Sequence, residues 1–280
     1  ILVRQLGLRR TCEAFWNSGN YPDALKEDIE AYCAGVNAKI KELGAENDFA
    51  PWTPVDCIVF GKYMAWDQSG SNDDLWFGVM LEKLGAEAFE QLWPLDRPYE
   101  IPAVRVQADA TKMPKAKLAA IPGASSSYLA ALKKFHEQWP GREGSFGSNN
   151  WAVAGTKTRS GKPMLCSDPH LGFTLPSIWY AAHMSAESRN IAGVMFAGSP
   201  SIVIGHNDHV GWGITNLETD AVDYFVETVD ENDPLKYKHR GDWKTMERIT
   251  EEVPVMGEAP HKLDIDYTVH GPVINREGRV

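Results

Sequence analysis

The chain has 280 residues, of which 43% are hydrophobic and 24% charged, a composition typical of a globular protein with a sizeable core. Its formal net charge of −10 argues against a nucleic-acid-binding surface, because an acidic surface repels phosphate backbones. No apolar run is long enough to cross a bilayer, so no membrane span is expected.

The first half of the chain predicts helices. From Pro22 to Leu43 apolar residues recur at steps of three and four, and Gly44 suits the position just past a helix end. Further helices are expected from Asp73–Asp74 through Leu81, then through Leu92, and from Ser125 to Trp139. Residues 95–123 are rich in proline and predict a loop or extended connector.

After Gly147 the pattern changes to short strand-like runs between turn signals. The expected strands are 151–155, 164–167, 191–197, 202–204, 210–215, 222–229 and 263–269. Turns are expected at 159–161, 199–200, 207–208 and 239–241. The sequence therefore predicts an α+β protein in which helices come first and strands follow from Ser148 onward.

The ends and the cysteines add two expectations. The chain begins without Met and stops in residues 275–280, which are typical of a hairpin turn, so we expect a fragment of a longer protein whose targeting segment lies upstream. None of the four cysteines forms a CxxC pair, so neither a zinc knuckle nor a redox dithiol is indicated. One or two disulfides and four free thiols are both compatible with the sequence.

The peptide bond between Gly147 and Ser148 is the candidate centre of chemistry. A serine hydroxyl can attack the carbonyl that precedes it, and hydrolysis of the resulting ester leaves a serine with a free α-amine. That amine has an unperturbed pKa near ~8, so it can act as a base near neutral pH. Alone, Gly-Ser-Asn is more often an ordinary loop, and the downstream sequence decides between the two interpretations.

With these residues in place, the sequence resembles the penicillin acylase (penicillin amidase) family of N-terminal nucleophile hydrolases. The β-portion residues that carry the resemblance are 147–151, 167–171, 176–180, 198–200, 205–207, 212–215, 220–223 and 268–272. The helical part matches through 4–8, 35–38, 51–52 and 64–67. Each match is weak alone, but their order and spacing fit over nearly the whole chain.

The resemblance implies a four-layer αββα sandwich with a helical α-subunit portion. Residues 1–123 would belong to the α subunit, 124–147 to a spacer, and 148–280 to the start of the β subunit. Both subunits would come from one precursor that cleaves itself at Gly147–Ser148.

The resemblance also implies roles for three catalytic residues. Ser148 is the expected nucleophile, and His170 occupies the position near the α-amine that holds Gln or His in the family. The backbone N–H of Asn216 is an expected oxyanion donor, worth roughly 3–4 kcal/mol of barrier. The second donor, an asparagine side chain, is expected downstream of Val280.

A structural calcium site is implied by the same resemblance. Its expected ligands are Asp220, the carbonyl of Val222, Asp223 and, with a shorter side chain than the family's usual Glu, Asp74. Hard oxygen ligands suit Ca²⁺. The alternative is an acidic, solvated turn. No organic cofactor is expected.

An aliphatic acyl pocket is the last implied site. Met64, Gln68, Leu171, Ile204 and Ile214 fall where the family lines its acyl site, although the same residues suit an ordinary core. Residues 206–209 contain two histidines, but they suit a turn between strands, and no third ligand has useful spacing for zinc.

The expected function is therefore an acylase that hydrolyses the side-chain amide of a small N-acyl compound, such as a β-lactam antibiotic or an N-acyl-homoserine lactone. The expected location is periplasmic or extracellular. Two alternatives stand beside it. One is a noncatalytic, calcium-stabilised binding protein on the same scaffold, and the other is a conventional serine hydrolase using a Ser148–His170–Asp168 triad.

Overall fold

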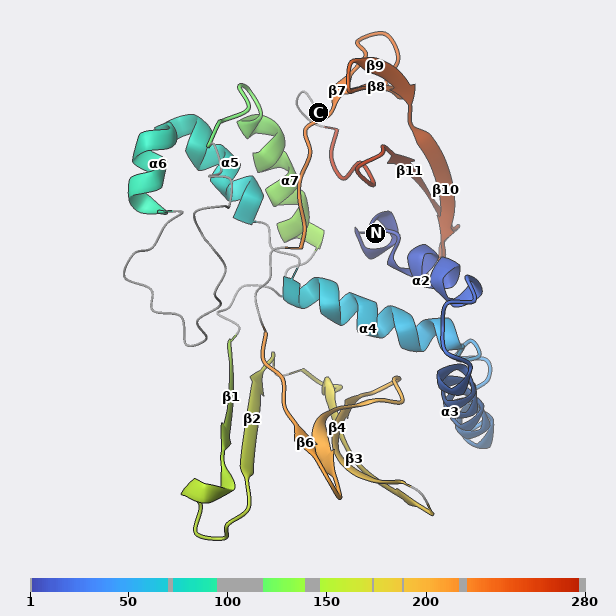
Figure 1. The fold of residues 1–280 in the computed structure, drawn as a ribbon. Helices are drawn as coiled ribbons and strands as arrows, with labels where there is room; N and C mark the ends of the chain where they lie inside the picture. The colour runs from blue at the N-terminus through green and yellow to red at the C-terminus, as the bar shows by residue number, and fades with distance from the viewer. Residues whose placement is uncertain are drawn as a thin grey trace. The chain divides into compact units, whose positions relative to one another are not determined.

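The structure is a computed structural model that describes residues 2–69, 73–94, 118–138, 147–172, 174–187, 189–216 and 221–276. All of the described α-helices precede residue 139 and all of the described strands follow residue 146, which confirms an α+β chain with the switch at Ser148 (Figure 1). The chain forms two compact units, and each unit combines segments from both halves.

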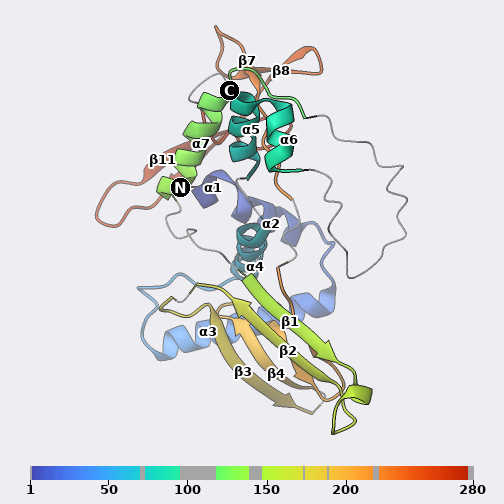
Figure 2. The same ribbon diagram turned by 90° about the vertical axis from the view of Figure 1, so that its left-hand side faces the viewer.

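Unit 2 comprises residues 7–70 and 142–222. Its helices are α2 (Leu8–Asn17), α3 (Asp23–Glu42) and α4 (Pro54–Ser69). Its strands are β1 (Gly147–Val153), β2 (Met164–His170), β3 (Trp179–Ala186), β4 (Arg189–Phe196), β5 (Ile202–Asn207) and β6 (Gly211–Trp212). β1 and β2 form an antiparallel hairpin, and the other four strands form an antiparallel sheet in the order β3-β4-β5-β6 (Figure 2).

Residues 35–38 and 51–52, two of the segments that carry the resemblance, have a structural role in unit 2. The Asn37 side chain donates to the Trp52 carbonyl at 2.9 Å and accepts from the Trp52 backbone N–H at 2.7 Å, so the loop before α4 is tied to α3. A Cβ added to Gly198 would lie 2.8 Å from the Trp52 ring, so the indole fits only against a glycine. These contacts position α4 beside the sheet.

Unit 1 comprises residues 1–6, 71–141 and 223–280. Its helices are α1 (Leu2–Gln5), α5 (Asp73–Leu84), α6 (Ala86–Leu92) and α7 (Ser125–Gln138). Its strands are β7 (Thr228–Val229), β8 (Lys236–His239), β9 (Asp242–Thr245), β10 (Glu247–Val253) and β11 (His261–Tyr267). β7, β8 and β9 form one sheet, and β10 pairs with β11.

Gln5 joins the early and late segments of unit 1. This buried side chain donates to the Val273 carbonyl at 2.6 Å and accepts from Lys134 Nζ at 3.0 Å. Lys134 also donates to the Ile274 carbonyl at 2.6 Å. The hydrogen-bonding groups of a polar side chain inside the fold are thus satisfied by α7 and by the segment after β11.

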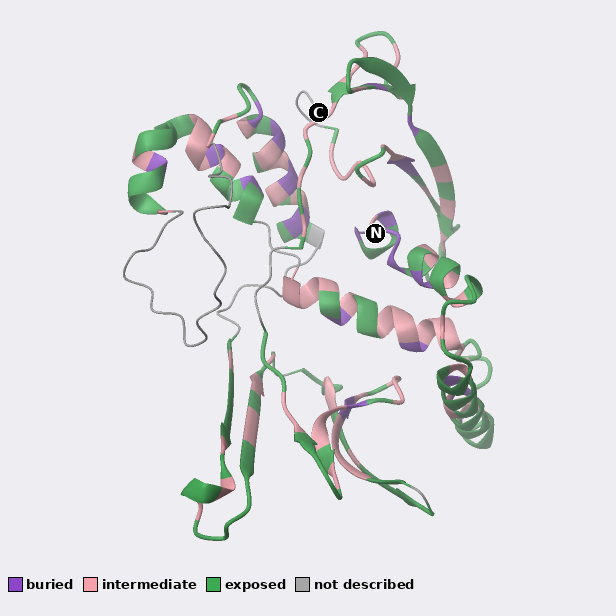
Figure 3. Ribbon diagram, in the orientation of Figure 1, coloured by how far each residue is buried: buried purple, intermediate pink, exposed green. Residues whose placement is uncertain are grey.

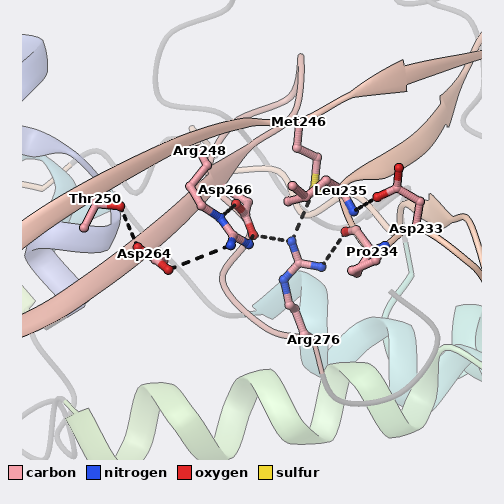
Figure 4. A network of polar contacts seen from close by, with 9 residues as sticks. All are labelled: Asp233, Pro234, Leu235, Met246, Arg248, Thr250, Asp264, Asp266 and Arg276. Atoms are coloured by element: carbon pink, nitrogen blue, oxygen red, sulfur yellow. Dashed lines mark hydrogen bonds and ion pairs between the residues drawn. The ribbon is translucent and has the colours of Figure 1, made fainter.

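The second polar centre of unit 1 is Asp266, which lies in the buried stretch of β11 (Figure 3, Figure 4). Arg248 binds both of its carboxylate oxygens, at 2.7 and 2.9 Å, and Arg276 also donates to it. Arg276 Nη1 donates to the Pro234 carbonyl at 2.9 Å, which connects the β10–β11 hairpin to the loop before β8. The hydrogen bonds from Arg248 are the main reason that the pKa of Asp266 lies below its usual range.

Most predicted elements are found, with shifted ends. The predicted helices correspond to α3, α5, α6 and α7, although Trp139 lies outside the described residues. The predicted turn at 239–241 is a two-residue hairpin loop, in which Arg240 and Gly241 both have positive φ. The expected strands at 210–215 and 222–229 are wrong over most of their length, since only Gly211–Trp212 and Thr228–Val229 are paired.

Candidate active site

The β1–β2 hairpin positions Ser148. Its register pairs Gly147 with His170, Ser148 with Pro169 and Asn149 with Asp168. Because side chains alternate between the two faces of a strand, those of Asn149, Asp168 and His170 lie on one face. A side chain at position 147 would lie on the same face. Ser148, Asn150 and Ser167 lie on the other face.

His170 is held over Gly147 on the first face. Its Nε2 lies 2.8 Å from Asp168 Oδ2 and 3.4 Å from Asn149 Nδ2. Its Nδ1 lies 3.7 Å from the place that a Cβ on Gly147 would occupy. The imidazole therefore turns one nitrogen to Asp168 and the other to the residue that precedes the expected cut.

This arrangement separates Ser148 Oγ from His170. Along a strand, residues two positions apart share a face and adjacent residues lie on opposite faces. Ser148 is adjacent to Gly147, so its side chain lies on the face opposite His170. The Ser148–His170–Asp168 triad that the sequence left as an alternative is therefore not assembled in this structure. His170 lies instead on the face opposite Ser148, beside Gly147.

The segment after β6 crosses the Ser148 face of the hairpin. Ser167 Oγ donates to the Ile214 carbonyl at 3.3 Å. A Cβ on Gly213 would lie 2.7 Å from Ser167 Cβ and 3.0 Å from Asn150 Nδ2. The backbone at Gly213 therefore lies so close to the hairpin that only glycine fits there. The expected oxyanion donor, Asn216, follows two residues after Ile214.

The Asn216 side chain fixes the end of this segment. Its Nδ2 donates to the Gln68 carbonyl at 2.8 Å, near the end of α4. The structure thus brings Ile214 to the face that carries Ser148 and joins Gln68 to Asn216. Of the other acyl-pocket candidates, Met64 is buried on α4, Ile204 lies partly buried in β5, and Leu171 follows β2.

Two of the expected calcium ligands share a cavity in unit 1. Asp74, in the first turn of α5, and Asp223 both line a cavity of about 460 Å³. The other lining residues are largely aromatic and include Phe77, Phe89, Trp93, Tyr224 and Phe225. Two carboxylates facing one space fit part of an oxygen-rich site, and Asp220 lies outside the described residues.

Among the described residues, which include Asp74 and Asp223, no group of three or more His, Cys, Asp and Glu side chains is arranged to hold an ion. In the 206–209 stretch, Asn207 Oδ1 accepts from the backbone N–H groups of His209 and Val210, both at 2.8 Å. This is the turn that the sequence predicted. None of the described helices is long and apolar enough to cross a membrane.

Sequence reasoning did not assign roles to Asn149, Ser167 and Gly213. The two-residue spacing of Asp168 and His170 on a strand was a usable signal, because it puts both on one face. No local signal identifies Ser167 or Gly213, because the two residues that meet are 46 positions apart in the sequence.

Comparisons with known proteins identify the family of this chain. The family model described as penicillin amidase matches residues 1–280. The acyl-homoserine lactone acylase QuiP of Pseudomonas aeruginosa is 27% identical over 98% of this chain and 33% of its own length. Penicillin acylase 2 proenzyme of Pseudomonas sp. (strain SE83) is 28% identical over 98% of this chain and 36% of its own length.

Among solved structures, a thermostable penicillin G acylase from Alcaligenes faecalis matches 46% of this chain and 23% of its own, with 24% identity and a TM-score of 0.39. The chain thus spans about a third of the length of the two curated relatives it matches. The α+β class is confirmed by the elements themselves, and the four-layer sandwich stays an expectation.

Proposed function

Because this chain belongs to the penicillin amidase family, we propose that the protein is an amide hydrolase whose nucleophile is Ser148, exposed by self-cleavage of the Gly147–Ser148 bond. The observation that carries the proposal is the placement of that bond. On the face of the hairpin that carries Ser148, Gly213 and Ile214 approach Asn150 and Ser167, and on the other face His170 lies over Gly147.

The first reaction is the cut itself. Ser148 Oγ attacks the carbonyl carbon of Gly147, the peptide C–N bond breaks, and the nitrogen of Ser148 leaves as an amine that takes up the hydroxyl proton. Water then hydrolyses the ester and releases the Gly147 carboxylate. The amine becomes the base for later turnovers, taking the Ser148 hydroxyl proton directly or through one water.

His170 orients that amine. An amine that serves as a base must direct its lone pair toward Ser148 Oγ, so its N–H groups need acceptors elsewhere. The Asp168 carboxylate, 2.8 Å from His170 Nε2, favours the proton on that nitrogen. Nδ1, on the side of Gly147, is then unprotonated and accepts an N–H from the new amine.

In turnover, Ser148 Oγ attacks the amide carbonyl of the substrate, and the Asn216 N–H stabilises the oxyanion together with the downstream asparagine that the family supplies. The amine product leaves, and water releases the acid. The substrate class is a small N-acyl compound, either a β-lactam side-chain amide or an N-acyl-homoserine lactone. Relatives named for both activities support this choice.

Calcium would be held by Asp74, Asp220, the Val222 carbonyl and Asp223, and would supply a structural bridge between the two subunits. The mature protein is accordingly proposed to consist of α and β chains from one precursor. A periplasmic or extracellular location belongs to the same proposal.

Denaturing electrophoresis of the full-length gene product tests the central step. The wild type should give two chains, with the heavier one beginning at Ser148 by N-terminal sequencing, and Ser148→Ala should stay intact. Ser160→Ala, at the far turn of the same hairpin, is the matched control and should process normally. Cleavage of Ser148→Ala at that bond would refute the proposal.

An acyl-chain panel of penicillins, cephalosporins and N-acyl-homoserine lactones, read by release of free amine, then identifies the substrate. Binding without amine release by processed protein would favour the noncatalytic alternative. Amine release by protein that remains uncut would favour a conventional serine hydrolase.

A further inference from the structure

Three buried cysteines converge where α2, α3 and α4 pack in unit 2. Cys12, Cys33 and Cys57 are each 3–4% exposed, and all four cysteines of the chain are free thiols in this structure. The sulfur atoms of Cys33 and Cys57 lie 3.7 Å apart. A disulfide requires about 2.05 Å, so each sulfur needs to move by less than about 1 Å, which a small side-chain rotation provides.

The surrounding contacts hold the two thiols at this distance. Trp52 Nε1 donates to Cys57 Sγ at 3.3 Å, and the same Trp52 is bound twice by Asn37 on α3. Cys33 also lies on α3, so the helix and the loop before α4 are connected independently of the sulfurs. The two sulfur atoms are therefore already held close together in the reduced protein, which preorganises them for bond formation.

A cavity borders Cys57 but not Cys33. Cys12 and Cys57 line an apolar cavity of about 530 Å³, together with Phe15, Tyr21, Ile58 and Lys62, and Cys33 is not among its lining residues. Burial raises the pKa of Cys33 to about 12, with the charge of Cys57 as the next cause. A small reagent that enters the cavity therefore meets Cys57 before it can reach Cys33.

We propose that Cys33 and Cys57 are the site of a disulfide that joins α3 to α4, formed by exchange with a small-molecule disulfide that enters through this cavity. The Cys57 thiolate attacks one sulfur of the reagent, and the reagent's other half leaves as a thiolate. Cys33 then transfers its proton to that thiolate and attacks Cys57 Sγ, which expels the second half as a thiolate. This thiolate takes up from solvent the proton that Cys57 released when it ionised.

The electrons and protons balance in these steps. The two cysteines together lose two electrons and two protons, and the small disulfide is reduced to two thiols. In the mixed disulfide Cys57 has no ionisable thiol, so its coulombic effect, the second cause of the raised Cys33 pKa, is removed, and this assists the closing step. The closed bond spans 24 residues of sequence.

The test uses the full-length protein, incubated with oxidised glutathione and then alkylated under denaturing conditions. Trypsin separates the three buried cysteines into peptides 11–26, 27–39 and 42–62. We expect a cross-linked 27–39/42–62 pair that disappears on reduction. We also expect a rise in Tm of at least about 3 °C, because the cross-link restricts the unfolded chain.

Cys12→Ser is the matched control and should keep both the cross-link and the Tm rise, while Cys33→Ser should lose both. The wild-type peptide map decides the proposal even if Cys33→Ser does not fold. A cross-link between 11–26 and 42–62, or glutathione retained on Cys57 with Cys33 still alkylated, would overturn it. So would complete alkylation of all buried cysteines after oxidation.

Discussion

Gly213→Ala should disable the active site while leaving most of the fold intact. The added Cβ would lie 2.7 Å from Ser167 Cβ and 2.9 Å from Ser167 Oγ. Ser167 Cβ is fixed to the backbone of β2, so it cannot rotate away. The 213–216 segment must therefore shift by about 1 Å from the hairpin, at a cost of about 1–3 kcal/mol of overpacking.

That shift moves the expected oxyanion donor, because Asn216 follows three residues later. A displacement of about 1 Å near the chemistry typically costs about 100-fold in rate. We therefore expect kcat/KM for amine release by the full-length processed enzyme to fall about 100-fold, with a Tm drop of only a few degrees.

Gly211→Ala provides the matched control in the same segment. Its added Cβ would meet the flexible end of Leu165 at 3.3 Å, and Gly211, like Gly213, has no positive φ. This variant should keep kcat/KM within about threefold of the wild type, since a leucine methyl can rotate away. If Gly213→Ala keeps the same activity as Gly211→Ala, the approach of this segment to Ser167 is not part of the active site.

Three further predictions concern charge and metal. Asp266→Asn should lower the free energy of unfolding by about 3 kcal/mol at pH 7, because the buried carboxylate leaves Arg248 without its partner. Since the folded pKa of Asp266 is lowered, this stabilisation is present above the unfolded pKa of about 4 and is lost as pH falls through the folded pKa, so the difference in urea unfolding between the two proteins should shrink as pH falls below about 4. Asp168→Asn should reduce kcat by about 10-fold, with recovery in Asp168→Glu. The effect is modest because Asp168 is 63% exposed, and an unchanged kcat would mean that Asp168 does not orient His170. A chelator should lower the Tm of the processed enzyme and Ca²⁺ should restore it, whereas Asp223→Ala should respond to neither; a Tm that ignores the chelator would exclude a structural calcium.

Regular periodicity made parts of the fold predictable from the sequence. The apolar steps of α3 and the turn residues at 239–241 specify local structure, and both are found. Helix α4 gave no such signal, because apolar side chains such as Ile58, Val59 and Phe60 follow one another around its surface. Its position is set by tertiary contacts, including the Asn37–Trp52 hydrogen bonds.

The same limit applies to the site. Ser148, His170 and Asn216 were identified through the family resemblance, which orders residues along the chain but not across a hairpin. Whether Ser148 and His170 share a face depends on the pairing of β1 with β2, and a register shift of one residue reverses the answer. The contact of Gly213 with Ser167 depends on how two distant segments pack, which no local pattern encodes.

The hydrogen bonds of Gln5 and Lys134 to the carbonyls of Val273 and Ile274 become contacts between two chains once the Gly147–Ser148 bond is cut. Donors and acceptors then belong to different polypeptides, although they lie in the same compact unit. In the intact precursor these groups meet by closing a loop, at a rate that does not depend on protein concentration. After the cut they meet by collision of two chains, so the assembly of unit 1 changes from a first-order to a second-order process, and dilution becomes a denaturing condition.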